Sequence, residues 1–475
     1  MGTWYKLTIS AAILLLISAN TALAGCPGGE GATRLKAGSA RLVYRPVGEI
    51  TVGEPFEMEI CIDPVPDDVR LTVDAIMPAH GHGMNYQIDV RETEPGLFVA
   101  EGFILHMPGL WRFRFVQRAE GMAAEFTPGE TATILSHGPW PPAFQAESTN
   151  RVSGDDRAIR FGETLFRDPR LSTDGSMACS DCHRPDLAFS DGLPTPTGRE
   201  EITRNTPATL NLAGRRWFGW DGASDSLWAA SIRPILNAAE MNNTAEGVAA
   251  TVRENSDLRD GYHRSFGVLP EQVAADRLLA DIGKALAAWQ ETQMTERTGF
   301  DDFRDALARG DTVAMDRYPE PAQRGLKLFV GKGRCSLCHY GPAFSNGEFA
   351  DVGVPFFIPR GVDRGRYGGI RVLQENPFSR TGNHSDDRSP RAQHQTRQVR
   401  LLHRNFGEFR VPSLRAIART APYMHDGSLA RLEDVIDHYS ELDESRLHVD
   451  GERILRPLHL TASEKADLLA FLRKL

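Results

Sequence analysis

The sequence predicts a mixed multidomain protein in which an N-terminal β-sandwich precedes two mainly α-helical domains. Its 475 residues leave room for roughly three domains at about 150 residues each. Apolar residues alternate with polar ones before about residue 136 and recur at helical spacing after residue 152, where the chain also contains an internal repeat. A hydrophobic content of 41% predicts packed cores.

Charge and cysteine content narrow the function classes. The 63 acidic and 54 basic residues give a net charge of −9, which argues against a protein that mainly binds nucleic acid. Six cysteines are too few for a disulfide scaffold of this size. Four of them form two close pairs, and two lie near the start of the chain: Cys179 with Cys182, Cys335 with Cys338, and Cys26 and Cys61.

Residues 1–24 have the pattern of a secretory signal peptide. Lys6 precedes an apolar run over residues 11–17, and the small residues Ala22 and Ala24 fit a cleavage site. The sequence therefore predicts export to the periplasm. No later run reaches the roughly 18 apolar residues of a membrane span.

Two alternative modifications are predicted for Cys26. Residues 23–26 resemble a bacterial lipobox, which would make Cys26 a lipidated membrane anchor. Alternatively, Cys26 pairs with Cys61 in an oxidising compartment. The disulfide is favoured because lipidation would leave Cys61 unpaired.

Residues 33–136 predict the β-sandwich. Short runs such as 56–62 and 111–116 alternate apolar with polar residues, and Pro/Gly turns separate them. Residues 137–152 begin with a proline-rich segment and predict a linker, since consecutive prolines break regular structure.

Two helical halves follow, residues 153–320 and 321–475, because one pattern occurs twice. In each half a Gly-x-x-Leu-Phe sequence precedes a C-x-x-C-H motif. The two copies are Gly162 to Phe166 with Cys179-Ser-Asp-Cys182-His183, and Gly325 to Phe329 with Cys335-Ser-Leu-Cys338-His339.

C-x-x-C-H is the attachment signature of c-type haem. Its two thiols form thioethers with the haem vinyl groups, and the histidine ligates the iron. A redox dithiol or half a zinc site would leave that histidine unexplained. Two copies in an exported chain therefore predict two covalently bound haems c, with His183 and His339 as iron ligands.

Two further segments of the helical part carry local signals. Residues 360–404 contain ten arginines and no lysine. They predict a loop-like insertion, either solvated or in contact with haem propionates or an acidic partner. Residues 461–475 predict a C-terminal helix, because Thr461 and Glu464 form a capping-box pattern before leucines at helical spacing.

Residues from about 155 to 475 resemble the bacterial dihaem cytochrome c peroxidase family, which includes MauG. The motifs occur in the family's order: 179–192, Arg204-Asn-Thr-Pro207, Trp220-Asp-Gly222, Glu240-Met241 and Thr420-Ala-Pro-Tyr-Met-His-Asp-Gly427. The resemblance implies two class I cytochrome c-like domains whose haems face each other across a calcium site. It also implies hydrogen peroxide as a substrate.

The resemblance assigns roles to individual residues. Asn205, Thr420 and Pro422 correspond to calcium ligands, whose oxygen atoms suit a hard cation. Trp220 corresponds to the residue that relays electrons or holes between the haems. Trp217 and Trp228 are instead expected to be ordinary aromatic residues of the core. Residues 235–241 place apolar neighbours around Glu240.

Glu240 corresponds to the distal acid of the peroxidatic haem, in the first half. It would move a proton between the two peroxide oxygens as base and then as acid. A glutamine that often assists this acid is replaced by Ala230, so water or another group would do its work.

Two departures from the ordinary peroxidases bear on the haem ligands. Arg199 stands where those enzymes place a capping histidine, so we expect the first haem to be open. At the position of a methionine ligand of the second haem stands Tyr439, as in MauG and its relatives, and His438 is a rival ligand. An anionic oxygen ligand stabilises oxidised iron, which suits a haem that reaches high oxidation states.

The N-terminal module resembles the YtkA-like family of immunoglobulin-like β-sandwiches, on the segment from Met77 to Met84. His80, His82 and Met84 would suit Cu(I), with the segment 106–107 on a neighbouring strand. The alternative is a glycine-rich turn with idle histidines. This module could also offer an oxidisable residue, Trp111.

Together these features predict an exported dihaem oxidoreductase that uses hydrogen peroxide and oxidises a protein side chain or another donor, as MauG does. One alternative is a cytochrome c peroxidase that draws electrons from a small cytochrome or cupredoxin. Another is a non-enzymatic electron-transfer or copper-handling protein. The expected cofactors are two haems c and calcium, with copper as a further candidate, and a membrane is a partner only if Cys26 is lipidated.

Overall fold

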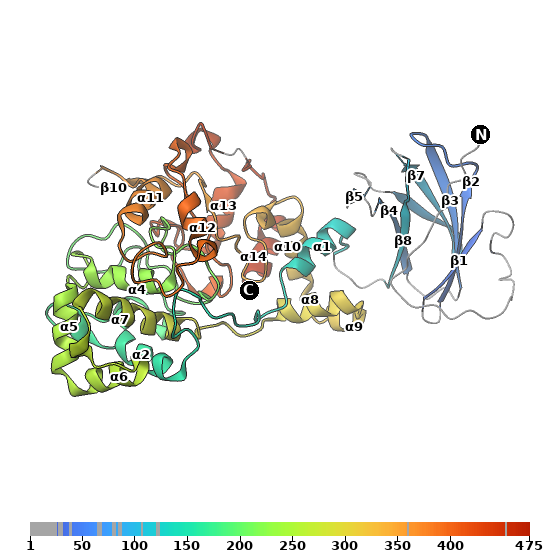
Figure 1. Cartoon of the computed structure of the whole chain (residues 1–475). Coiled ribbons are helices and arrows are strands. Elements are labelled where there is room, and N and C mark those ends of the chain that lie inside the picture. The colour runs from blue at the N-terminus through green and yellow to red at the C-terminus, as the bar shows by residue number, and fades with distance from the viewer. Residues whose placement is uncertain are drawn as a thin grey trace. The chain divides into compact units, whose positions relative to one another are not determined.

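The computed structural model describes residues 26, 32–37, 40–63, 69–77, 82–83, 88–105, 108–119, 124–358, 361–451 and 454–475. The chain divides into two compact units (Figure 1). We call Met1–Met122 the strand unit and Ala123–Leu475 the helical unit.

The strand unit contains two antiparallel sheets, with strand orders β1-β2-β3-β7-β6 and β5-β4-β8. Their strands are β1 (Thr33–Ala37), β2 (Ala40–Val47), β3 (Pro55–Asp63), β4 (Val69–Met77), β5 (His82–Gly83), β6 (Asp89–Glu94), β7 (Leu97–Ile104) and β8 (Arg112–Ala119). Met58 and Ile60 of β3 share one buried cluster with Val73 of β4 and Phe113 of β8, so both sheets contribute to a single core. The predicted alternation over residues 56–62 forms the central strand of the larger sheet.

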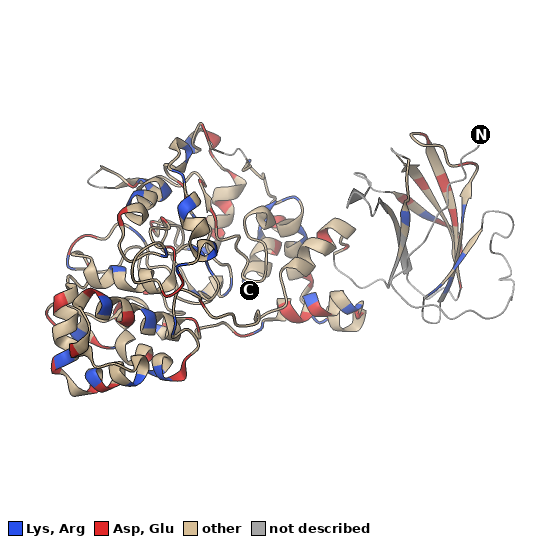
Figure 2. Ribbon diagram, viewed as in Figure 1, with Lys and Arg blue, Asp and Glu red and all other residues tan. Residues whose placement is uncertain are grey.

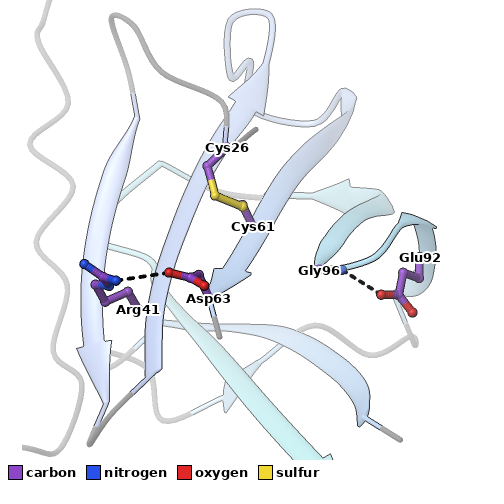
Figure 3. The surroundings of a disulfide bond; sticks show 6 residues. All are labelled: Cys26, Arg41, Cys61, Asp63, Glu92 and Gly96. Atoms are coloured by element: carbon purple, nitrogen blue, oxygen red, sulfur yellow. Dashed lines mark hydrogen bonds and ion pairs between the residues drawn. A yellow bond between two sulfur atoms is a disulfide. The ribbon is translucent and has the colours of Figure 1, made fainter. Parts of the chain in front are cut away.

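A disulfide joins Cys26 to Cys61 of β3 (Figure 3). The two Cα atoms lie 5.5 Å apart, within the range that disulfides require. An ion pair between Arg41 and Asp63 lies on the adjacent part of β2 and β3, with N and O 3.1 Å apart (Figure 3). The structure therefore shows the pairing that accounts for both early cysteines.

The boundary predicted between the sandwich and the linker was wrong. The strand unit ends near residue 122 rather than 136, and helix α1 (Pro128–Ser136) packs on helices α8 (Gly299–Arg309) and α10 (Glu320–Val330) of the helical unit. Residues 137–152 also belong to the helical unit. The Trp140 indole donates to the carbonyl of Thr295 at 2.9 Å, and Asn150 donates to that of Lys284 at 3.0 Å.

The helical unit holds both predicted halves in one compact body. Its remaining helices are α2 (Asp156–Phe166), α3 (Cys179–Cys182), α4 (Leu227–Leu236), α5 (Ala245–Glu254), α6 (Ser256–Phe266), α7 (Ala275–Gln290), α9 (Thr312–Met315), α11 (Gly365–Glu375), α12 (Pro390–Gln398), α13 (Leu432–Ser440) and α14 (Ala462–Leu472). Two pairs of two-residue strands also lie in this unit: β9 (Phe349–Ala350) pairs with β12 (Phe409–Arg410), and β10 (Phe357–Ile358) pairs with β11 (Gly361–Val362). Acidic and basic residues are interleaved over these helices (Figure 2).

The internal repeat corresponds to two equivalent helix crossings. In the first half, α2 crosses α7 where Gly162 faces Ala285, and in the second, α10 crosses α14 where Gly325 faces Asp467. A Cβ atom added to either glycine would lie 2.0 Å from the facing carbonyl oxygen. Only glycine allows the backbones to approach this closely, which explains why each half carries it at the same place.

Two local predictions had different outcomes. The predicted C-terminal helix is α14, and Thr461 and Glu464 form its capping box. The prediction of a loop-like segment over residues 360–404 was wrong, because α11 and α12 lie within it. Arg366 of α11 is buried, and its guanidinium lies 4.0 Å from the ring centroid of Phe349, so this arginine packs into the fold.

None of the helices that the structure describes is long and apolar enough to cross a membrane.

Candidate functional site

The two C-x-x-C-H motifs fold into loops of the same geometry. In each loop the histidine backbone N–H donates to the carbonyl of the first cysteine at 2.9 Å. The imidazole Nδ1 lies close to a carbonyl oxygen further along the loop, at 3.2 Å for His183 and Phe189 and at 3.0 Å for His339 and Phe344. Because a carbonyl only accepts, Nδ1 carries the proton and Nε2 keeps a free lone pair. This is the arrangement in which a histidine ligates a metal.

The phenylalanines that hold the imidazoles were missed by the sequence analysis, although the sequence carries their signal. Ala-Phe-Ser occurs at residues 188–190 and again at 343–345, so the repeat extends past each histidine. Phe189 and Phe344 both have positive φ angles, 60° and 52°. Each loop therefore bends in the same unusual way to aim its carbonyl at the ligand histidine.

The four motif cysteines are half-buried and form no disulfide. Burial raises the pKa of Cys179 and of Cys335 to about 12, and that of Cys182 to about 11. Neutral thiols of this kind are poor redox nucleophiles and poor zinc ligands without a cation beside them. They fit covalent attachment of a haem.

Glu240 lies near the first motif. Its negative charge contributes to the raised pKa values of Cys179 and Cys182, so the carboxylate lies near both thiols. Burial raises the pKa of Glu240 itself, while a hydrogen bond from Asn237 at 2.6 Å and the charge of Arg233 act in the opposite direction. The structure thus places a half-buried carboxyl group beside the first attachment loop.

Arg199 does not have the surroundings of a haem-capping residue. Its guanidinium forms an ion pair with Asp174 and a hydrogen bond to the Ser176 hydroxyl at 3.1 Å. Its backbone N–H donates to the carbonyl of Ala239 at 2.8 Å. The arginine is therefore committed to a surface cluster.

A cavity of about 1220 Å³ opens beside the second motif. It is lined by Cys335, Cys338, His339, Tyr439 and Trp220, among others. This volume exceeds the roughly 300–1,000 Å³ typical of small-molecule sites, so a group as large as a haem can be accommodated.

Tyr439 and its rival His438 have different surroundings. Tyr439 lines the cavity, and its pKa is raised by burial and by the nearby thiols of Cys335 and Cys338. His438 instead places Nε2 2.7 Å from the carbonyl oxygen of Val352. The geometry favours Tyr439 as the side chain that faces the second attachment loop.

Three arginines give the cavity a positive potential: Arg366 and Arg410 are buried, and Arg215 is half-buried. Burial lowers the pKa of Arg410 and of Arg366 to about 10, and burial together with the charge of Arg410 lowers that of Arg215 to about 9. All three side chains line the cavity. Cations held away from water favour an anionic occupant, and the two carboxylates of a haem meet this requirement. The residues present therefore fit a haem at this site.

His137 supports the second attachment loop from outside the repeat. Its Nε2 lies 3.0 Å from the carbonyl oxygen of His339, and its ring lies 4.4 Å from that of Phe344. His137 thus contacts both the ligand histidine and the residue that orients it. The sequence alone predicts that His137 lies in a linker, because nothing local indicates its contact with the second motif.

The predicted calcium ligands and the predicted relay tryptophan come together at the same cavity. Asn205, Thr420, Pro422 and Trp220 all line it. The Trp220 indole donates to the carbonyl of Asn205 at 2.8 Å, while the Asn205 amide donates to the carbonyl of Leu193 at 2.9 Å. The Asn205 side-chain oxygen therefore keeps its acceptor capacity, as a hard cation requires.

The predicted copper residues lie mostly outside the described part of the chain. His80, Met84 and the segment 106–107 are not described, and His82 is described only as a backbone position in β5, paired with Met77 of β4. Trp111, the candidate oxidisable residue, is 3% exposed in the core of the strand unit. Trp217 and Trp228 are buried, as expected of core aromatics.

Two attachment loops of one geometry within a helical unit define the class of c-type dihaem proteins. Residues 156–309 match the family model described as di-haem cytochrome c peroxidase. The chain is 33% identical over 319 residues to the methylamine utilization protein MauG of Methylorubrum extorquens, covering 67% of this chain and 77% of the relative. It is 30% identical over 288 residues to cytochrome c551 peroxidase of Nitrosomonas europaea, covering 60% and 73%.

Solved structures show the same architecture. A MauG-like protein associated with microbial copper homeostasis superimposes with a TM-score of 0.54 at 26% identity, covering 71% of this chain and 95% of that one. The diheme peroxidase BthA from Burkholderia thailandensis shares the fold with a TM-score of 0.53 at 21% identity, covering 70% and 89%. The chain belongs to the dihaem cytochrome c peroxidase family. It is a haem-dependent oxidoreductase of the peroxidase type, with hydrogen peroxide as its substrate.

Proposed function

We propose that the chain is a MauG-like oxidoreductase that reacts with hydrogen peroxide in its first half and oxidises a protein side chain or another donor through its second half. The observation that carries this proposal is the position of Tyr439, which lines the second cavity while His438 contacts a backbone carbonyl. The tyrosine oxygen and the His339 imidazole, which line the same cavity, would then hold the iron of the second haem. A hard anionic ligand favours the oxidised metal and so suits the storage of oxidising equivalents.

Each residue then has a definite task. A bound haem supplies an iron that peroxide can oxidise. Glu240 takes a proton from one peroxide oxygen and returns it to the departing oxygen, which leaves as water. Trp220 connects the two halves as a readily oxidised side chain, and its hydrogen bond to Asn205 fixes the indole. Asn205, Thr420 and Pro422 would hold calcium beside it.

The Tyr439→Phe variant tests the second ligand. We expect the absorption spectrum of the oxidised, haem-loaded variant to change at the second haem, and peroxide to leave that haem unoxidised. Tyr423→Phe is the matched control, because Tyr423 also lines the cavity but donates its hydroxyl to the carbonyl of Ile417 at 3.0 Å. An unaltered spectrum in Tyr439→Phe would rule out tyrosine ligation.

The second candidate is a cytochrome c peroxidase that draws electrons from a small cytochrome or cupredoxin. The similarity to cytochrome c551 peroxidase favours it. The two functions differ in their use of the donor. A peroxidase would turn over continuously with a reduced small redox protein, whereas a MauG-like enzyme would leave a stable oxidised residue on a protein target. Membership of an enzyme family argues against a purely electron-carrying protein.

The strand unit would be a YtkA-like module with an immunoglobulin-like sandwich and a Cu(I) site at His80, His82 and Met84. The similarity of the helical unit to a protein associated with copper homeostasis supports this part of the proposal. The disulfide between Cys26 and Cys61 fits an oxidising compartment such as the periplasm. Cu(I) titration of the full chain and of a His80→Ala/His82→Ala variant tests it: equal Cu(I) binding by both chains would refute the site.

A further inference from the structure

Three side chains of the types that ligate metals meet beside the second cavity, and one of them, His448, lines it. His403 lies in a short 3-10 helix, His403–Asn405, whereas His448 and Asp450 follow another, Glu444–Arg446. One ligand atom from each residue lies within 4.8 Å of the others. Two segments more than forty residues apart in the sequence therefore bring two imidazoles and a carboxylate to one point.

The contacts among the three side chains show how they could bind an ion. His403 Nδ1 lies 2.9 Å from a carboxylate oxygen of Asp450, and the rings of His403 and His448 have their centroids 4.9 Å apart. The backbone N–H of Asp450 donates to His448 Nδ1 at 3.1 Å. This bond leaves Nε2 of His448 as the nitrogen that can bind a metal.

The ligand-bearing turns are themselves held in place. The backbone N–H of His448 donates to the carboxylate of Asp351 at 2.7 Å, and the N–H of Leu402 donates to the Asn405 side chain at 2.9 Å. His448 is half-buried and lines the cavity, whereas His403 and Asp450 are exposed to solvent. One ligand is therefore fixed in the cavity wall, and the other two can adjust.

The donor set selects the kind of ion. Imidazole nitrogens favour zinc and copper over calcium and magnesium, which prefer all-oxygen sites. A tetrahedral ion with bonds of about 2.1 Å holds its ligand atoms roughly 3.4 Å apart, so small rotations of the exposed side chains suffice. Water would occupy the open position.

We propose that His403, His448 and Asp450 form a site for a divalent transition-metal ion, Zn²⁺ or Cu²⁺, beside the second cavity. The site is distinct from the residues assigned to haem and calcium, and from the candidate copper residues of the strand unit. It does not depend on peroxide activity.

Calorimetric titration with Zn²⁺ tests the proposal. The experiment uses the haem-loaded full chain, saturated with Ca²⁺ and carrying His80→Ala and His82→Ala to remove the other candidate histidines. We expect one Zn²⁺ to bind, and His403→Ala, His448→Ala or Asp450→Asn to weaken binding at least tenfold. His394→Ala is the matched control, because His394 is another exposed histidine that lines the cavity.

An unchanged haem spectrum in each variant verifies that the helical unit is folded. Electron paramagnetic resonance of Cu²⁺ bound to the same chain should show hyperfine coupling to two imidazole nitrogens, reduced to one in His403→Ala. The absence of Zn²⁺ binding, or binding that the three variants and His394→Ala weaken equally, would overturn the proposal.

Discussion

The two haem-attachment halves are alike in their backbone and differ in what surrounds it. Both orient the ligand histidine through a phenylalanine carbonyl, and both cross two helices at a glycine. The first half adds Glu240 near its thiols, whereas the second adds Tyr439, His137 and a cavity with buried arginines. The repeat therefore supplies attachment, and segments outside the repeat supply the chemistry that separates the halves.

Of the substitutions considered, replacement of Glu240 should have the largest effect. It should slow the reaction with peroxide in the first half and leave the second half unchanged. Glu240→Gln removes the group that transfers the proton, so we expect the reaction with peroxide to slow by about 10²-fold to 10⁴-fold. Stopped-flow absorption measures this rate. The exposed Glu246→Gln should react as the unmodified chain does, and a normal rate in Glu240→Gln would remove the distinction between the halves.

The two glycine crossings should respond alike. Gly162→Ala and Gly325→Ala each force a Cβ into a carbonyl oxygen, so each should lower the free energy of unfolding by about 1–3 kcal/mol. Urea denaturation of the haem-loaded chain measures this loss. Gly129→Ala, in α1, meets no atom within 4 Å and should be neutral or stabilising. A large effect at one crossing alone would show that the repeat is not structurally equivalent.

Removing His137 should affect the second half selectively. His137→Ala deletes the contact with the His339 carbonyl and leaves a small cavity against Phe344, so we expect a loss of stability of about 1–3 kcal/mol. The midpoint potential of the second haem should shift while that of the first does not. Spectroelectrochemical titration separates the two. Equal shifts in both haems would mean that His137 acts only through general stability.

The pH dependence of the peroxide reaction should reveal Glu240. Burial raises the pKa of this carboxyl above its ordinary value, and the base must be deprotonated to accept a proton. The rate should therefore be full above this raised pKa and fall about tenfold per pH unit below it. Rate profiles between pH 4 and 8 would show the inflection, which should be missing in Glu240→Gln. A flat profile for the unmodified chain would contradict the assignment.

The sequence predicted the parts of the site that local motifs encode. The two attachment loops were predicted from the spacing of the C-x-x-C-H motifs, and Glu240, Trp220 and Tyr439 from the resemblance. In the structure Glu240 lies near the first loop, whereas Trp220 and Tyr439 line the cavity beside the second. The Ala-Phe-Ser repeat was visible in the sequence but overlooked.

Other features depend on contacts between distant segments. The Pro-rich segment after residue 136 predicted a linker, because nothing local shows that Trp140 bonds to a carbonyl 155 residues away. For the same reason, the arginine-rich segment concealed two helices, and the cluster of His403, His448 and Asp450 could not be assembled from spacing. Local periodicity predicts helices and strands, but it does not predict which distant segments of the chain pack against them.

The most direct test of the account is an absorption spectrum of the fully oxidised, haem-loaded chain before and after one equivalent of hydrogen peroxide, without any reductant. An open first site coupled to a tyrosine-ligated second site predicts an immediate change in the bands of both haems. No change until one haem has first been reduced would contradict the account, and the chain would then be an ordinary cytochrome c peroxidase with a blocked first iron.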